Sequence, residues 1–316
     1  MRKSRKNAIR LPLSIGALVL GAGMFSQGLN ANLNLYGNRV GVKRANGTWY
    51  TDFATIEDSH AYADQINIQI MEESSILMKN ENDALPLKKG TSVSILGNCS
   101  YHVVSGGTGS GGGSGLRVDL QGSLRKAGFK VNGLAEDFYS TLDSTASIST
   151  GMFGGGGVQT VQEDPVRLAP IEDSYRNYRT VVWSISRTGG EGTDLATNSL
   201  PNNKDKSKHY LQLNDNEEKM VKYLGDLKAS GQIDKVIMLV NTANVMEMAE
   251  VQKSSAIDAI LWIGQPGPNG LEGVGHILNG TVSPSGRTVD IWDADHKKDP
   301  TWHNFGDNKQ NTWDED

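Results

Sequence analysis

Apolar runs alternate with amphipathic stretches along most of this chain. Short apolar runs predict strands, and longer stretches with an apolar residue every three or four positions predict helices. We predict strands over 91–97, 129–133, 179–186, 235–241 and 256–264, and helices over 116–128, 213–231 and 267–280. Repeated strand–helix–strand units are typical of a mostly parallel sheet sandwiched by helices. The pattern therefore predicts a three-layer α/β/α fold.

Local signals define several of these elements. The run "TVVWSIS" (180–186) is apolar enough to be covered on both faces of a sheet. Asn214 stands three residues before Glu217, which is a capping-box arrangement at the start of the helix over 213–231. A further helix is expected in 54–80, with helical spacing up to about Ser75, followed by a turn that closes at Pro86.

Two segments interrupt the pattern, and a third ends it. "SGGTGSGGGSG" (105–115) separates the first strand from its helix, and the low-complexity stretch 140–160 reads as a flexible surface loop. The residues after Asp295 are polar and lack periodicity. We expect a connector over 39–64, the sandwich domain over 65–296, and a polar tail or truncated interdomain connector over 297–316.

The first 38 residues form a targeting segment. Five basic residues precede an apolar run, and no charged residue follows until after Asn38 (Arg2, Lys3, Arg5, Lys6 and Arg10). This arrangement predicts a signal anchor with its N-terminus in the cytoplasm, which would place the domain on the extracellular face of the membrane. A cleaved signal peptide, with its best cleavage site near Ala31, would instead give a secreted protein.

Composition and net charge limit the classes of protein to which this chain can belong. The 316 residues are 37% apolar and 21% charged, with a mean hydropathy of −0.42 and a net charge of −5. These values fit a soluble globular body and argue against a nucleic-acid surface, which needs a concentrated basic footprint. With Cys99 as the only cysteine, an intramolecular disulfide and a Cys-based zinc site are both excluded.

Cofactor and metal motifs are weak. The six histidines are scattered without an H-x-x-x-H pair, so no metal is expected. Gly107, Gly109 and Gly112 match G-x-G-x-x-G, but this loop begins about ten residues after Leu96 and the expected acidic residue is missing. No G-K-[ST] follows, and we therefore expect no cofactor.

The strongest chemical candidate is Glu191. It lies in "ISRTGGEGTDL" (185–195), a glycine-rich turn directly after an apolar strand, with Arg187 and Asp194 close to it in sequence. Paired carboxyl groups are the catalysts of glycoside hydrolases, and one of them donates a proton to the leaving oxygen. Read from the residues alone, the segment could equally be a solvated acidic loop.

A resemblance favours the catalytic interpretation. Segments of the chain resemble, in the same order and over roughly 65–300, the α/β sandwich domain of glycoside hydrolase family 3, which includes β-glucosidases. They are "ESSILMKNENDALPL", "SYHVVSGGTGSGGGSG", "ISRTGGEGTDL", "LQLNDNEEKMV" and "DAILWIGQPGPNGLEGVGHILNGTVSPSGRTVDIW". The resemblance implies a retaining β-glucosidase-like hydrolase with Glu191 as general acid/base. It also implies substrate-binding roles for Arg187, Asp194, Gly107, Thr108 and Ser110.

The chain departs from the family pattern in three places. Leu195 replaces the usual arginine after Asp194, and "GQPGPNG" replaces a more acidic segment. The (β/α)8 barrel that carries the aspartate nucleophile in the family has no counterpart here. The order of segments resembles a permuted member cut off before its barrel, so the resemblance implies a barrel partner in cis or in trans. The expected substrate is an oligosaccharide or β-glucoside, with attachment to a membrane through the N-terminal segment. A non-catalytic, membrane-anchored carbohydrate-binding module or an inactive remnant is the alternative.

Overall fold

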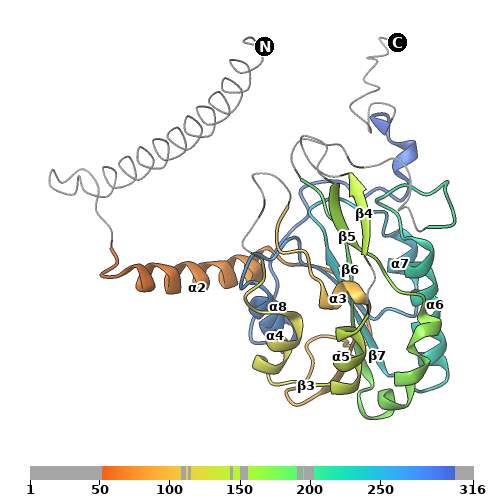
Figure 1. Cartoon of the computed structure of the whole chain (residues 1–316), viewed down its shortest axis with the longest axis horizontal. Coiled ribbons are helices and arrows are strands. Elements are labelled where there is room, and N and C mark those ends of the chain that lie inside the picture. Colours follow the sequence, from red (N-terminus) through yellow and green to blue (C-terminus); the bar gives the residue numbers. More distant parts are fainter. Residues whose placement is uncertain are drawn as a thin grey trace, which may run out of the picture. The chain divides into compact units, whose positions relative to one another are not determined.

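The computed structural model describes residues 52–107, 112, 115–142, 145–149, 156–190, 195 and 203–302 (Figure 1). The chain separates into two compact units, Met1–His60 and Ala61–Asp316. The predicted signal anchor lies outside the described residues. Among the helices that are described, none is both long and apolar enough to cross a membrane.

The core of the second unit is a mixed six-stranded sheet with the strand order β1-β8-β7-β6-β2-β3. Its strands are β1 (Ile76–Asn80), β2 (Ser92–Leu96), β3 (Lys130–Val131), β6 (Thr180–Ser186), β7 (Lys235–Asn241) and β8 (Ala259–Trp262). Neighbouring strands from β8 to β3 are parallel, and β1 runs antiparallel to β8 at one edge. The predicted mostly parallel sheet is confirmed.

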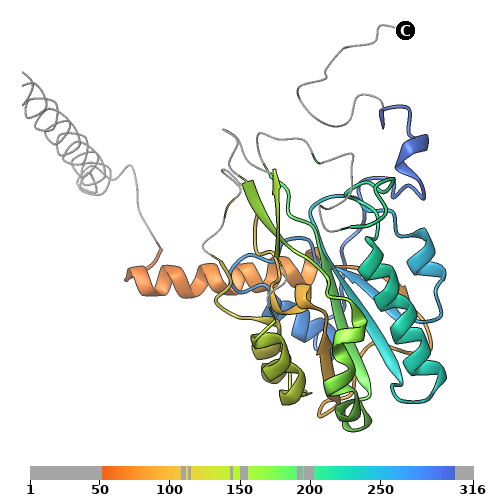
Figure 2. The same cartoon turned by 45° about the vertical axis from the view of Figure 1, so that its right-hand side comes forward.

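Helices cover both faces of this sheet. The helices of the described residues are α2 (Ile56–Ser74), α3 (Asn98–Tyr101), α4 (Leu120–Lys126), α5 (Gly133–Ser140), α6 (Asp215–Ala229), α7 (Ala249–Lys253) and α8 (Leu271–Leu278), with 3-10 segments η4 (Pro165–Asn177) and η5 (His296–Lys298). Figures 1 and 2 show α4 and α8 on one side of the strands and α6 and α7 on the other.

The side chains of the central strands alternate between two apolar clusters, one on each face. In β6, Val181, Trp183 and Ile185 join the cluster that contains residues of α5, α6 and α7. Val182 from the same strand joins the cluster that contains residues of α4 and α8. This alternation explains why the sequence of β6 is apolar at successive positions: a strand covered on both faces buries all of them.

Three sequence expectations were wrong in detail. Residues 140–160 were expected to be a flexible loop, but they contain an antiparallel hairpin of β4 (Thr145–Ser149) and β5 (Gly156–Thr160). The hairpin is fixed because the buried Gln159 side chain bonds to neighbouring loops. The helix expected from 116 begins at Leu120, since Asp119 caps it by accepting a hydrogen bond from Gly122 N. Strand β1 falls where the sequence predicted only the approach to a turn.

The strand order creates a switch point between β2 and β6. The chain leaves β2 towards β3 on one side, and later enters β6 on the other side of β2. In parallel α/β sheets, ligands bind in the crevice outside the carboxyl ends of the strands where the order reverses. Here those ends lead into the glycine-rich segment after Gly97 and into the loop that begins at Arg187.

Candidate active site

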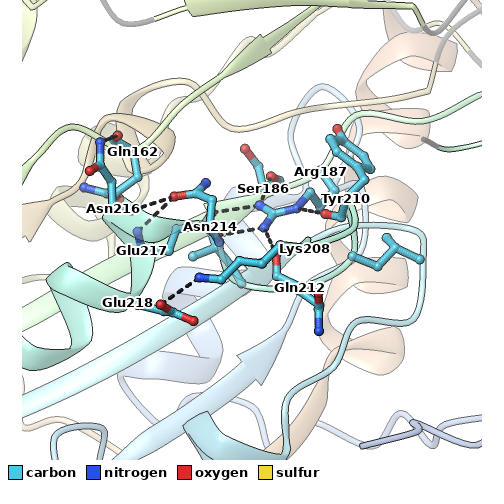
Figure 3. A network of polar contacts seen from close by, with 12 residues as sticks. Gln162, Ser186, Arg187, Lys208, Tyr210, Gln212, Asn214, Asn216, Glu217 and Glu218 are labelled. Carbon is cyan, nitrogen blue, oxygen red and sulfur yellow. Dashed lines mark hydrogen bonds and ion pairs between the residues drawn. The ribbon is translucent and has the colours of Figure 1, made fainter. Parts of the chain in front are cut away.

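Arg187 is the first residue after β6, and its guanidinium is buried in an ion pair with Glu217 of α6 (Figure 3). Both side chains are 1% exposed. Nη1 donates to Glu217 Oε1 and Nη2 donates to Oε2, each at 2.7 Å. Such a two-pronged contact is the geometry in which a guanidinium matches a carboxylate. The pair therefore fixes α6 against the end of β6.

The remaining donors of Arg187 bind backbone carbonyls. Nε donates to Tyr210 O at 2.6 Å, Nη1 also donates to Ser186 O at 2.9 Å, and Nη2 also donates to Gln212 O at 2.6 Å. A guanidinium has five N–H groups, so all of them are used within the protein. Burial acts to lower the pKa of Arg187, but the Glu217 carboxylate outweighs this and holds that pKa above its usual value.

A second set of hydrogen bonds joins the two ends of the loop that follows β6. Thr188 N donates to Gln159 Oε1 at 2.7 Å and lies 2.9 Å from Tyr210 Oη. Tyr210 Oη lies 2.6 Å from Gln159 Oε1 and donates to Thr188 O at 2.9 Å. We call Arg187, Thr188, Tyr210, Gln212 and Glu217 the loop neck. Because both ends are held, the segment between them, which contains Glu191, is presented from a rigid base.

Leu195, four residues beyond Glu191 in sequence, lies close to Gly189. A Cβ placed on Gly189 would lie 3.4 Å from Leu195 Cδ2 and 3.0 Å from Asn244 Oδ1. Leu195 packs against the apolar cluster on the α6 side of the sheet. The departure from arginine at this position thus gives the turn an apolar anchor beside Gly189.

The neighbouring loop, after β2, rests on a buried carboxylate. Glu163 accepts hydrogen bonds from Asn98 N at 2.8 Å and from Tyr139 Oη at 2.6 Å, and burial raises its pKa. Gly97 has φ 87°, and a Cβ there would lie 2.5 Å from Cδ1 of Trp183. Only glycine fits this turn, because the left-handed conformation and the indole both exclude a side chain.

The other sequence candidates are placed only in part. Gly107 is described and half-buried, whereas Thr108, Ser110, Glu191 and Asp194 lie outside the described residues. The substrate-binding roles of these residues and of Arg187, and the acid/base role of Glu191, stay predictions. Within the described ranges, no three His, Cys, Asp or Glu side chains converge to hold a metal ion. Burial raises the pKa of the Cys99 thiol to about 12, which keeps it uncharged.

Sequence reasoning found the capping box at Asn214 and Glu217 but missed the larger role of Glu217. The structure confirms the box, with Asn214 N donating to Glu217 Oε2 at 2.9 Å and Glu217 N donating to Asn214 Oδ1 at 3.0 Å. The same carboxylate neutralises Arg187, which lies 30 residues earlier. Tyr210 and Gln159 were also missed, since neither stands in a recognisable motif.

Comparison with known proteins assigns the family. The sequence profile described as "Glycosyl hydrolase family 3 C-terminal domain" matches residues 75–316. The chain belongs to glycosyl hydrolase family 3. The matched residues include all six strands of the central sheet, and the family resemblance drawn from the sequence motifs is confirmed.

The relatives of this family 3 chain are β-glucosidases. A β-glucosidase of Ruminococcus albus is 27% identical over 241 residues, which cover 75% of this chain and 24% of the relative. β-Glucosidase A of Butyrivibrio fibrisolvens is 25% identical over 258 residues, covering 74% of this chain and 29% of the relative. The family 3 chain thus spans about a quarter of the length of the curated relatives it matches.

Solved structures share the fold. β-Glucosidase 3B of Thermotoga neapolitana, solved in complex with glucose, superposes with a TM-score of 0.62 at 20% identity, covering 80% of this chain and 33% of that one. A β-glucosidase from Paenibacillus barengoltzii gives a TM-score of 0.60 at 24% identity, covering 77% and 25%. Like the sequence relatives, these proteins are much longer than the family 3 domain described here.

Proposed function

We propose that this chain takes part in the hydrolysis of O-glycosyl bonds by supplying the acid/base half of a retaining β-glucosidase. Family membership supports the reaction class. The observation that carries the proposal is the loop neck: a buried ion pair and the Tyr210 hydroxyl hold both ends of the Glu191 loop at the carboxyl edge of the sheet. A catalytic carboxyl group needs such a fixed base, because small displacements reduce the rate greatly.

Glu191 has two tasks in the proposed reaction. As a carboxylic acid it protonates the glycosidic oxygen while a second carboxylate attacks the anomeric carbon, so the aglycone leaves and a covalent glycosyl-enzyme forms. As a carboxylate it then takes a proton from water, which attacks the anomeric carbon and releases the sugar. In retaining enzymes the two carboxyl groups are about 5–5.5 Å apart. We place the second one on a (β/α)8 barrel supplied in cis or in trans.

The proposed substrate is a β-glucoside or a short oligosaccharide. The relatives in sequence are β-glucosidases, and one similar structure holds glucose. Arg187 is proposed to act indirectly, because its five donors are all engaged in the loop neck. Gly107, Thr108, Ser110 and Asp194 are proposed to contact the sugar. With residues 1–38 as a signal anchor, the reaction would take place outside the cytoplasm.

A complementation experiment tests the proposal. The 316-residue chain, a separately produced (β/α)8 barrel of a family 3 β-glucosidase, and their mixture are each assayed for release of 4-nitrophenol from 4-nitrophenyl β-glucoside. We expect turnover only in the mixture. Glu191→Gln should abolish it, whereas Glu250→Gln, a change of an exposed glutamate, should preserve it.

The role of Glu191 is tested separately with azide. A Glu191→Ala variant, mixed with the barrel that supplies the nucleophile, should form the glycosyl-enzyme from a 2,4-dinitrophenyl β-glucoside, whose leaving group needs no protonation, and azide should then yield β-glucosyl azide. Turnover by the isolated chain that Glu191→Gln abolishes would show that the nucleophile lies in this chain. Saccharide binding unaffected by Glu191→Gln, without turnover in any mixture, would favour the non-catalytic binding module.

A further inference from the structure

The carboxylate of Glu247 lies where three separate segments of the chain meet. Glu247 follows β7. Its Oε1 lies 2.8 Å from His209 Nε2 and accepts a hydrogen bond from His296 N at 2.6 Å. Its Oε2 accepts from Gln212 Nε2 at 2.6 Å. The half-buried Glu247 side chain, 10% exposed, therefore joins the segment around His209 and Gln212 to residues 293–302, which we call the C-terminal segment.

The hydrogen bonds of His209 define its protonation. Leu211 N donates to His209 Nδ1 at 3.2 Å, so Nδ1 is the unprotonated nitrogen of a neutral ring. The proton is then on Nε2, which donates to Glu247. The ring also packs 4.9 Å from that of Trp302 and 5.5 Å from that of His296, measured between centroids. The His209 ring thus contacts the C-terminal segment directly, at Trp302 and His296, and indirectly through Glu247.

Gln212 continues the connection into the loop neck. Its backbone carbonyl accepts the Arg187 Nη2 hydrogen bond at 2.6 Å, while its side-chain amide donates to Glu247. Its Oε1 accepts from His209 N at 3.1 Å, which prevents the amide from turning round. Hydrogen bonds with defined donors and acceptors therefore connect Arg187 to Gln212, Gln212 to Glu247, and Glu247 to His296.

We propose that Glu247 is a positioning residue that fastens the C-terminal segment to the neck of the Glu191 loop. The segment and the loop then move as one body, and whatever the C-terminal segment contacts is held in a fixed relation to the loop. The importance of this for catalysis rests on the proposed function. The physical link does not, because it involves only groups of this chain.

The alternative is that Glu247 contributes only to the overall stability of the unit. The contacts argue for a local role: all three donors to the carboxylate come from the two segments that it joins, and none comes from the sheet or from the helices α4 and α8. Glu250, three residues further on, offers a matched control. Its side chain is 90% exposed, and Lys253 at 3.4 Å is its recorded ion-pair partner.

Hydrogen exchange on the full 316-residue chain tests the proposal without any substrate. In Glu247→Ala, the His296 amide loses its charged acceptor, and its exchange should accelerate about tenfold, as should that of residues 293–302 in general. Amides of β6 and β7 should be unchanged, and Glu250→Ala should match the wild type. Unchanged protection of 293–302 would overturn the proposal. A uniform increase over the whole unit would also overturn it.

The tautomer of His209 provides a second measurement, one that a general loss of stability would not mimic. Long-range ¹H–¹⁵N spectra at pH 8 should show a neutral His209 ring with its proton on Nε2 in the wild type and in Glu250→Ala. Glu247→Gln keeps a carbonyl oxygen for His209 and should keep this tautomer. Glu247→Ala leaves the Leu211 N hydrogen bond to Nδ1 but removes the acceptor of the Nε2 proton, so this proton should exchange with water faster than in the wild type. Equal exchange of the Nε2 proton in all variants would contradict the assignment. A negative glucosidase assay would leave these results unaffected, so the two proposals fail separately.

Discussion

Strand β6 has an arginine–carboxylate pair at each end, and the two pairs differ in their surroundings. At the amino end, Arg179 donates to both oxygens of Asp234, at 2.8 and 2.5 Å, with side chains 39% and 56% exposed. At the carboxyl end, Arg187 and Glu217 also make a two-pronged contact, through Nη1 and Nη2, with side chains 1% exposed. An ion pair that is exposed to water contributes little to the free energy of unfolding. Removing one partner of a buried pair is costly, because it leaves an uncompensated charge in the interior. The comparison separates a surface contact from one that holds a loop.

The largest effect should come from breaking the buried pair on one side. Glu217→Ala leaves the Arg187 guanidinium buried without its carboxylate, and the free energy of unfolding should fall by about 3–5 kcal/mol. Urea unfolding followed by circular dichroism measures this. Glu218→Ala, which changes the next residue and a more exposed ion pair, is the control. Equal losses in the two variants would mean that burial of the pair does not matter.

A double variant sharpens the same test. Arg187→Met combined with Glu217→Gln removes both charges, so it should recover a large part of the stability that Glu217→Ala loses. The carbonyls of Tyr210 and Gln212 would still lack their donor, and the loop neck should therefore remain more open to hydrogen exchange than in the wild type. Full recovery of both the free energy of unfolding and the protection from hydrogen exchange would show that the ion pair has no part in closing the loop.

A smaller effect should appear at the carboxyl end when the pH is lowered from 7.5 to 5. Burial lowers the pKa of His209 below its usual 6.5, although Glu247 opposes the shift; His296 and Lys297 add to it. The folded state thus favours the neutral ring. Its contribution to stability is complete above pH 6.5 and is lost as the pH falls below that value. Unfolding measured from pH 7.5 to 5 should show this loss in the wild type and a weaker dependence in His209→Phe. Identical pH profiles would contradict it.

The smallest effect is expected at the amino end. Asp234→Asn removes the carboxylate that faces Arg179, but water solvates both side chains in the folded and unfolded states. The midpoint of thermal unfolding should be indistinguishable from that of the wild type in 0.15 M salt. A loss of stability comparable to that of Glu217→Ala would show that the exposed fraction of these ion pairs does not predict their contribution to the free energy of unfolding.

Sequence patterns predicted the parallel sheet well, because 181–183 and 236–240 are unbroken apolar runs, and a strand that is apolar at successive positions is covered on both faces. They missed β1, where Lys79 interrupts an apolar run and the register shifts between Leu77 and Lys79. They also missed the β4–β5 hairpin, whose glycines, serines and threonines give no periodicity. The hairpin depends on distant partners of Gln159, such as Thr188 and Tyr210.

The sequence indicated which loops belong to the candidate site, but not which residues hold these loops in place. The glycines around Glu191 and the family motifs predict a turn there, and this part of the prediction lies outside the described residues. The partner of Arg187 could not be read from the sequence, because Glu217 satisfies a local capping rule and its second contact depends on how α6 packs beside β6. Sequence alone also gave no reason to connect Glu247 with His209, 38 residues away.

Closure of the Glu191 loop at its base has a consequence for how this domain can change over evolution or in the laboratory. Once Arg187, Tyr210 and Glu217 join the two ends, the entropic cost of closing the intervening chain rises only slowly with its length. Doubling the number of residues costs about 0.6 kcal/mol. Insertions and deletions between the two ends are therefore cheap, provided that the base is left intact. The segment between the two ends can therefore be exchanged as a unit, and its length can vary without a change in the strands that carry the ends.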